Sequence, residues 1–132
     1  MTALFVCDHL QIKAPLKFII DTGSVHTTLP EHTAKELGID LTDLSRKIQI
    51  KSSGIGGSCT THYLGGVSLI FRAVDGTEVG EEIHGVHILE NPPPRSEQER
   101  KTFDTIPNLL GLDVIRRYGL RFDKNAVWLE RE

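Results

Sequence analysis

Apolar and polar residues alternate along most of this chain in short runs that glycine, proline and charged residues interrupt, a pattern typical of strands. Residues 4–20 are rich in Val, Ile, Leu and Phe, and Pro15 predicts a turn between two arms of a hairpin. The second arm, residues 16–20, runs directly into Asp21. The pattern therefore places a carboxylate at the end of an apolar strand.

A short helix is expected next. Thr28 is a candidate N-cap, and Pro30 and Glu31 suit a first helical turn. Gly38 suits the C-terminal stop of that helix.

A second hairpin is predicted in the middle of the chain. Residues 48–50 alternate as a strand does, and residues 59–64 would form the returning arm. Between them, Gly54, Gly56 and Gly57 predict a flexible tip, because glycine tolerates backbone angles that other residues avoid.

The pattern continues with strands at residues 67–74 and 78–89, joined by a turn at Asp75-Gly76. Three consecutive prolines and a charged run then predict an exposed loop insertion at residues 91–105.

The last part of the chain is expected to begin with a short strand at Leu109 and Leu110 that ends at Gly111. A helical segment at residues 113–118 and a hairpin with its turn at residues 123–125 would complete a mainly β fold with short helices.

Composition limits the function classes. The chain has 132 residues, which predicts one domain over residues 1–132, and its net charge of −3 with no basic run argues against a nucleic-acid partner. No stretch approaches the roughly 20 apolar residues of a membrane span, and the first residues lack the pattern of a signal peptide. Cys7 and Cys59 are expected as free thiols, and we predict a cytoplasmic location.

The strongest chemical signal is the sequence Asp21-Thr22-Gly23-Ser24. Gly23 allows the backbone close to the carboxylate, and the hydroxyls of Thr22 and Ser24 offer hydrogen bonds around it. Two carboxyls that share one proton can activate water and protonate a peptide carbonyl together. One chain supplies one such Asp, and a symmetric dimer would place two copies face to face.

These residues resemble the retropepsin family of aspartic proteases. Residues 19–24 match its two apolar residues followed by Asp-Thr-Gly-Ser, and residues 53–57 resemble the tip of its flap. Residues 109–115 resemble the later apolar pair, glycine and short helix. The resemblance covers roughly residues 6–129, and it is closest to the retropepsin-like domain of the DNA-damage-inducible ubiquitin-shuttle proteins, which share Leu-Leu-Gly-Leu-Asp and a similar terminal hairpin.

The resemblance implies a closed β-barrel of the acid protease fold, active as a homodimer without a metal or other cofactor. Asp21 would be the catalytic carboxylate, Thr22 would bond across the dimer, Gly23 would contact substrate, and Ser24 would hydrogen-bond the Asp21 carboxylate. The flap would close over an extended or unfolded polypeptide and would consist of Gly54, Ile55, Gly56 and Gly57.

Two of this chain's departures from the family motivate an alternative function. Retroviral members pair an acidic residue after the active-site glycine with an arginine after the later glycine, whereas this chain has Val25-His26 and Leu112 there. The loop insertion at residues 91–105 is an addition. These departures keep open an alternative, a dimeric peptide-binding or dimerisation module of the same fold with little or no turnover.

Other chemistries have weaker support. His84 and His87 would point to opposite faces of one strand, and nothing in the spacing completes a metal site. The glycines at residues 54–57 lack the spacing of a phosphate-binding loop, and Ser24 lacks the elbow of a serine hydrolase. His26 could tune a pH response, although a surface or packing role is the simpler interpretation.

Overall fold

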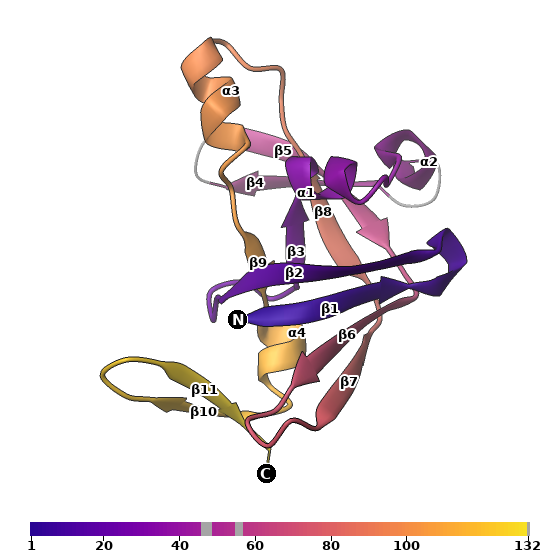
Figure 1. The fold of residues 1–132 in the computed structure, drawn as a ribbon. Helices are drawn as coiled ribbons and strands as arrows, with labels where there is room; N and C mark the ends of the chain where they lie inside the picture. The colour runs from indigo at the N-terminus through magenta and orange to yellow at the C-terminus, as the bar shows by residue number, and fades with distance from the viewer. Residues whose placement is uncertain (46–48, 55–56, 132) are drawn as a thin grey trace.

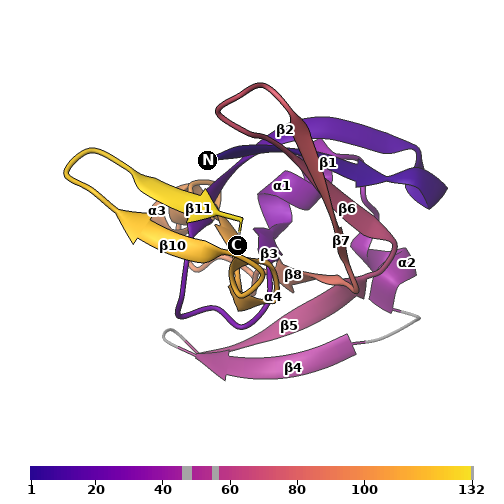
Figure 2. The ribbon, with the colours of Figure 1, turned by 90° about the horizontal axis from the view of Figure 1, so that it is seen from below.

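The structure is a computed structural model that describes residues 1–45, 49–54 and 57–131. Most of it is a nine-stranded sheet with the order β4-β5-β8-β3-β9-β2-β1-β6-β7, and β10 and β11 form a separate hairpin. The large sheet curls into a half-barrel (Figures 1 and 2). The strands are β1 (Thr2–Cys7), β2 (Ile12–Ile20), β3 (Thr28–Pro30), β4 (Gln49–Gly54), β5 (Gly57–Leu64), β6 (Val67–Arg72), β7 (Glu78–Ile83), β8 (Val86–Glu90), β9 (Asn108–Leu110), β10 (Gly119–Phe122) and β11 (Val127–Glu130).

Helices are short and lie around the sheet. They are the 3₁₀ turn η1 (Asp8–Leu10) and the α-helices α1 (Glu31–Glu36), α2 (Leu41–Ser45), α3 (Glu97–Phe103) and α4 (Leu112–Ile115). The predicted mainly β fold with short helices is confirmed. Among the described residues, no helix is both long enough and apolar enough to span a membrane.

The first hairpin forms, but its turn is not at Pro15. The strands β1 and β2 are joined through η1, and Pro15 lies inside β2 opposite Leu4. Phe18 exchanges hydrogen bonds with Met1, so alternation turns the nitrogen of Pro15 away from β1. That side of β2 meets β9 only at residues 18–20. The proline therefore sits where no ladder hydrogen bond is lost.

The predicted helix after the Asp-Thr-Gly-Ser sequence begins later than expected. Thr28 is extended in β3 and is not an N-cap, because the pairing of β3 with β8 and β9 prevails over its capping preference. The helix α1 begins after Pro30 with no side-chain cap. Gly38 does follow its end, with a φ of 77° that favours glycine.

The segment 91–105 is not the continuous loop that its composition predicted, since α3 occupies Glu97–Phe103. Ser96 caps this helix by accepting a hydrogen bond from the N–H of Glu99 at 3.1 Å. The Glu99 carboxylate in turn accepts from the N–H of Arg95. Ser-x-x-Glu is a capping signature, and it outweighs the charged and proline-rich composition around it.

The long strand predicted over residues 78–89 is two strands. The chain leaves β7 at Ile83 and starts β8 at Val86, and the two strands pair with different neighbours. A Cβ on Gly85 would lie 1.9 Å from Cζ of Tyr63. The break therefore occurs where only glycine fits beneath a tyrosine ring.

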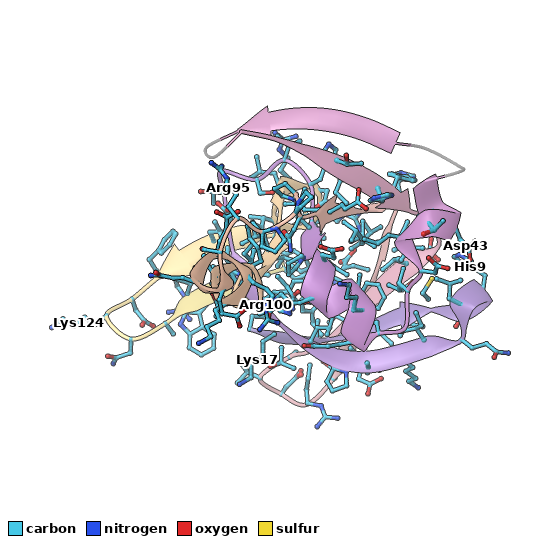
Figure 3. All side chains as sticks on the ribbon, turned by 90° about the horizontal axis from the view of Figure 1, so that it is seen from above. His9, Lys17, Asp43, Arg95, Arg100 and Lys124 are labelled. Carbon is cyan, nitrogen blue, oxygen red and sulfur yellow. The ribbon has the colours of Figure 1, made fainter. Side chains whose placement is uncertain are left out.

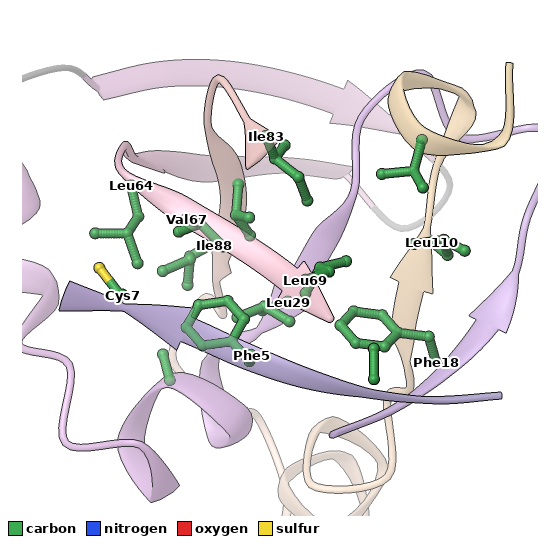
Figure 4. Packing of buried hydrophobic residues seen from close by; sticks show 14 of the residues in the cluster. Phe5, Cys7, Phe18, Leu29, Leu64, Val67, Leu69, Ile83, Ile88 and Leu110 are labelled. Carbon is green, nitrogen blue, oxygen red and sulfur yellow. The ribbon is translucent and has the colours of Figure 1, made fainter. Parts of the chain in front are cut away.

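The core lies inside the curl of the sheet. Its fully buried side chains include Phe5, Leu29, Leu69, Ile88 and Leu110, which come from five different strands. Figure 4 shows these side chains packed together. Charged side chains such as Lys17 and Lys124 point outward (Figure 3). Burial of this apolar surface is what holds strands from distant parts of the chain together.

Candidate active site

Asp21 stands at the end of β2, in the interior of the large sheet. The strand β2 runs parallel to β9, with Ile20 opposite Leu110. The N–H of Asp21 extends this pairing by donating to the carbonyl of Leu110 at 3.0 Å. Two segments about ninety residues apart in the sequence therefore fix where the carboxylate emerges.

A tight turn holds the Asp21 carboxylate. The N–H of Gly23 donates to Oδ1 of Asp21 at 2.9 Å, and the N–H of Ser24 donates to the Asp21 carbonyl at 3.2 Å. A Cβ on Gly23 would lie 3.2 Å from the same Oδ1, which is a tight contact. The side chain of Asp21 remains half-exposed, and Thr22 is exposed. The carboxylate is thus oriented by backbone and open to a reactant.

Ser24 has a different partner from the one expected. Its hydroxyl donates to the carbonyl of His26 at 2.7 Å, and the hydroxyl of Thr28 donates to the same oxygen at 2.9 Å. The turn residues therefore stabilise the loop after Asp21, while the backbone of Gly23 takes the contact with the carboxylate.

The loop is anchored from beneath by a buried polar pair that the sequence did not single out. Thr27 is fully buried, and its N–H and hydroxyl both donate to the carboxylate of Asp113, at 2.9 Å and 2.7 Å. The Thr27 hydroxyl also accepts from the N–H of Gly111 at 3.1 Å. The buried Thr27 hydroxyl thereby both donates and accepts a hydrogen bond, as burial of a polar group requires.

The segment after Gly111 completes this anchor. The N–H of Leu112 donates to the carbonyl of Ser24 at 2.8 Å, and the N–H of Asp113 donates to the carbonyl of Val25 at 3.1 Å. A Cβ on Gly111 would lie 2.4 Å from the carbonyl carbon of His26. The glycine is therefore required by a close backbone approach. The one signal in the sequence for Asp113 is its position directly after Leu-Leu-Gly-Leu.

An aromatic cluster joins this loop to the second hairpin. The rings of His26 and His87 are stacked with centroids 4.0 Å apart and planes 18° from parallel. Tyr63 meets His87 edge-on at 6.0 Å. Burial lowers the pKa of His87, and the neighbouring His26 lowers it further. His84 lies in the break before β8, so His84 and His87 do not share one strand as predicted.

The predicted second hairpin is present as β4 and β5, which pair antiparallel up to Gly54 opposite Gly57. Ile55 and Gly56 lie outside the described residues. The arm β5 pairs with β8, and Tyr63 is opposite His87. The hairpin therefore starts beside the loop that carries Asp21.

Two further observations concern ligands. Within the described ranges, no group of three or more His, Cys, Asp or Glu side chains could hold a metal ion. A cavity of about 580 Å³ lies among α1, α3 and the prolines, and none of residues 21–28 lines it.

Comparisons with known proteins show a shared fold. A search of curated proteins finds no match. The fold is similar to the crystal structure of a retropepsin-like aspartic protease from Rickettsia conorii, with a TM-score of 0.58 and 22% identity over 95% of this chain and 85% of that chain. A protease of EIAV in complex with the inhibitor HBY-793 matches with a TM-score of 0.45 and 14% identity over 88% of this chain and 85% of that chain.

The sequence also matches a family model. The model describes aspartyl proteases, and the match covers residues 9–114, which include the Asp-Thr-Gly-Ser turn, the second hairpin and Asp113. The matched range covers most of the chain and contains Asp21. The chain therefore belongs to the aspartyl protease family.

Proposed function

We propose that this protein is an aspartic endopeptidase that hydrolyses peptide bonds with a dyad of Asp21 and the partner's Asp21 across a homodimer. The observation that supports this best is the Asp21 carboxylate itself, which is half-exposed and oriented by the Gly23 N–H on a loop anchored to α4. A general base that must take a proton from bound water needs this combination of fixed orientation and access.

The proposed mechanism uses two carboxyls a few ångströms apart. Such groups cannot both ionise, so one keeps a proton while the other is a carboxylate. The carboxylate takes a proton from a water molecule as that water attacks the peptide carbonyl, and the protonated partner gives its proton to the carbonyl oxygen. The resulting tetrahedral species collapses when the leaving nitrogen receives a proton from the dyad.

Exposed apolar side chains beside the loop support the dimer. Ile19 is 55% exposed and Val25 is 56% exposed, and they flank the Asp-Thr-Gly-Ser turn on both sides. The projecting C-terminal hairpin adds Phe122, which is 69% exposed. In this proposal these residues are covered by the second copy, Thr22 bonds across the interface, and the two half-barrels close one barrel.

The substrate would be an extended or unfolded polypeptide. The hairpin of β4 and β5 stands at one end of the sheet order, and its tip at Gly54 and Gly57 would act as the flap. A peptide between flap and loop would bind by main-chain hydrogen bonds as an added strand. A cytoplasmic location and kinship with the ubiquitin-shuttle group remain parts of this proposal.

Cleavage of casein from acid to neutral pH tests the activity, with the wild type beside Asp21→Asn and with or without pepstatin. We expect cleavage by the wild type alone and its inhibition by pepstatin. Full activity of Asp21→Asn would contradict the proposal.

Sedimentation tests the dimer separately. We expect a dimer whose dissociation on dilution removes cleavage in parallel. A monomer at every concentration would leave one carboxylate per site and would contradict the dyad.

The absence of the family's usual acidic residue and arginine favours a second candidate, a dimeric peptide-binding module. Asp113, however, anchors the loop by two hydrogen bonds without that pair. Peptide binding that survives Asp21→Asn, with no cleavage by either protein, would favour this candidate.

A further inference from the structure

The stacked histidines join the loop that follows Asp21 to β8, beside the base of the hairpin of β4 and β5. His26 belongs to the loop that follows Asp21, and His87 belongs to β8, which pairs with the hairpin arm β5. The ring of His26 is exposed, whereas His87 is half-buried. The backbone of His26 is fixed because its carbonyl accepts from two hydroxyls. An imidazole is therefore held at a defined place beside the catalytic turn.

Burial and the neighbouring His26 lower the pKa of His87, and the Asp113 carboxylate opposes them by raising that pKa. Among the described residues, no carboxylate lies within salt-bridge distance of either ring, and the Asp113 carboxylate already accepts two hydrogen bonds from Thr27. The titratable groups that act on or contact the pair are Asp113 on α4 and Tyr63 on β5, and Asp21 precedes His26 by five residues on the same loop. Two stacked imidazolium rings would repel, so a proton on one ring disfavours a proton on the other.

The two rings differ in exposure, since His26 is exposed and His87 is half-buried. Burial disfavours a charge on His87, which agrees with the lowered pKa of His87. A protonated His26 would present its charge to solvent on the loop that follows Asp21. A bound carboxylate would neutralise it, whereas an arginine or lysine side chain would be repelled.

We propose that His26, supported by His87, forms a substrate subsite that selects an acidic side chain, Asp or Glu, near the scissile bond. This inference rests on the proposed peptidase function and adds the substrate class to it. An anion stabilises the protonated imidazole, so the preference grows as the pH falls and is lost at a pH where the imidazole is neutral. Where retroviral members place an acidic residue after the active-site glycine, this chain has Val25-His26.

Matched peptides test the preference in cleavage. The peptide around the casein bond that is cut fastest is resynthesised with Glu or Gln at each of three positions on either side of that bond. At one position we expect the wild type to favour Glu over Gln in kcat/KM by about fivefold at pH 5, the size expected for one partly exposed ion pair. At pH 7.5 the ratio should approach one.

Variants separate charge from shape. His26→Gln should lose the preference at both pH values, and His26→Arg should keep it at pH 7.5 because its charge does not titrate. His84→Gln is the matched control, since His84 is an exposed histidine whose backbone carbonyl, rather than its ring, contacts Tyr63. Equal cleavage of Glu and Gln peptides at every position and pH would overturn the inference while leaving the peptidase function intact.

A binding measurement decides the matter if no peptide is cleaved. The histidine ring resonances of the Asp21→Asn protein are titrated with pH in the presence of capped Ala-Ala-Glu-Ala-Ala or its Gln counterpart. We expect the Glu peptide alone to raise the titration midpoint of the His26 ring and to leave that of His84 unchanged. Identical midpoints with both peptides would overturn the subsite, whatever the outcome for catalysis.

Discussion

The loop around Asp21 and the C-terminal hairpin are both turns between extended segments, yet they are held in opposite ways. The loop depends on Leu110, Gly111 and Asp113, which lie far away in the sequence. The turn of the hairpin of β10 and β11 is closed by its own residues, since Asp123 accepts from the N–H groups of Asn125 and Ala126 and from Nε1 of Trp128. Leu120 and Leu129 of this hairpin pack against the core.

This difference has consequences for stability and for function. A loop assembled from distant segments is rigid only while the whole fold is intact, so damage to it and loss of the fold go together. A locally closed hairpin can open by itself at a lower free energy than the body. The Asp21 carboxylate, which we propose to be catalytic, lies in the first kind of turn, and this suits a group that must keep one orientation.

The largest effect is expected from Gly111→Ala. The added Cβ would meet the backbone at His26 and Thr27, which has no flexible end that could move aside. We expect a loss of about 3 kcal/mol or more in the free energy of unfolding, as for severe overpacking, measured by urea denaturation.

Gly80→Ala on β7 is the control, because nothing lies within 4 Å of a Cβ at that position. It should leave the stability nearly unchanged. Equal stabilities of the two variants would show that the close approach at Gly111 is not a constraint.

A smaller loss is expected from Asp113→Ala. It leaves the buried N–H and hydroxyl of Thr27 without their acceptor, which should cost about 2–3 kcal/mol. Asp113→Asn keeps one oxygen acceptor and should cost about half as much. If Asp113→Ala unfolds at the wild-type urea midpoint, the anchor contributes nothing.

The smallest effect should follow from Asp123→Ala in the hairpin. Hydrogen exchange should quicken at the amides of residues 119–130 alone, with the denaturation midpoint of the body unchanged. Faster exchange around Asp21 in this variant would show that the two turns are coupled and would contradict the independence of the hairpin.

The same hairpin should respond to acid. The hydrogen bonds from Asn125, Trp128 and Ala126 lower the pKa of Asp123 below its ordinary value of 3.8. Asp123 therefore stabilises the hairpin above that value, and this stabilisation disappears as the pH falls through the lowered pKa. Exchange of the hairpin amides in the wild type should accelerate in that range and match Asp123→Ala below it.

Sequence reasoning succeeded where the signal is local. A few neighbouring residues determine the Asp-Thr-Gly-Ser turn, the short strand that contains Leu109 and Leu110, the helix stop at Gly38 and the terminal hairpin. The capping signature at Ser96 and Glu99 was equally local, and the proline-rich composition beside it led to the wrong prediction of a continuous loop.

The sequence by itself determined the mainly β pattern, the single carboxylate at the end of an apolar strand and the glycine-rich hairpin, because periodicity and turn chemistry act over a few residues. Only the tertiary structure decided that Thr28 is extended, that Pro15 lies within a strand, that Asp113 holds Thr27 and that His26 stacks on His87. These features depend on which distant segments become neighbours. That choice comes from burying the shared core, which no local pattern records.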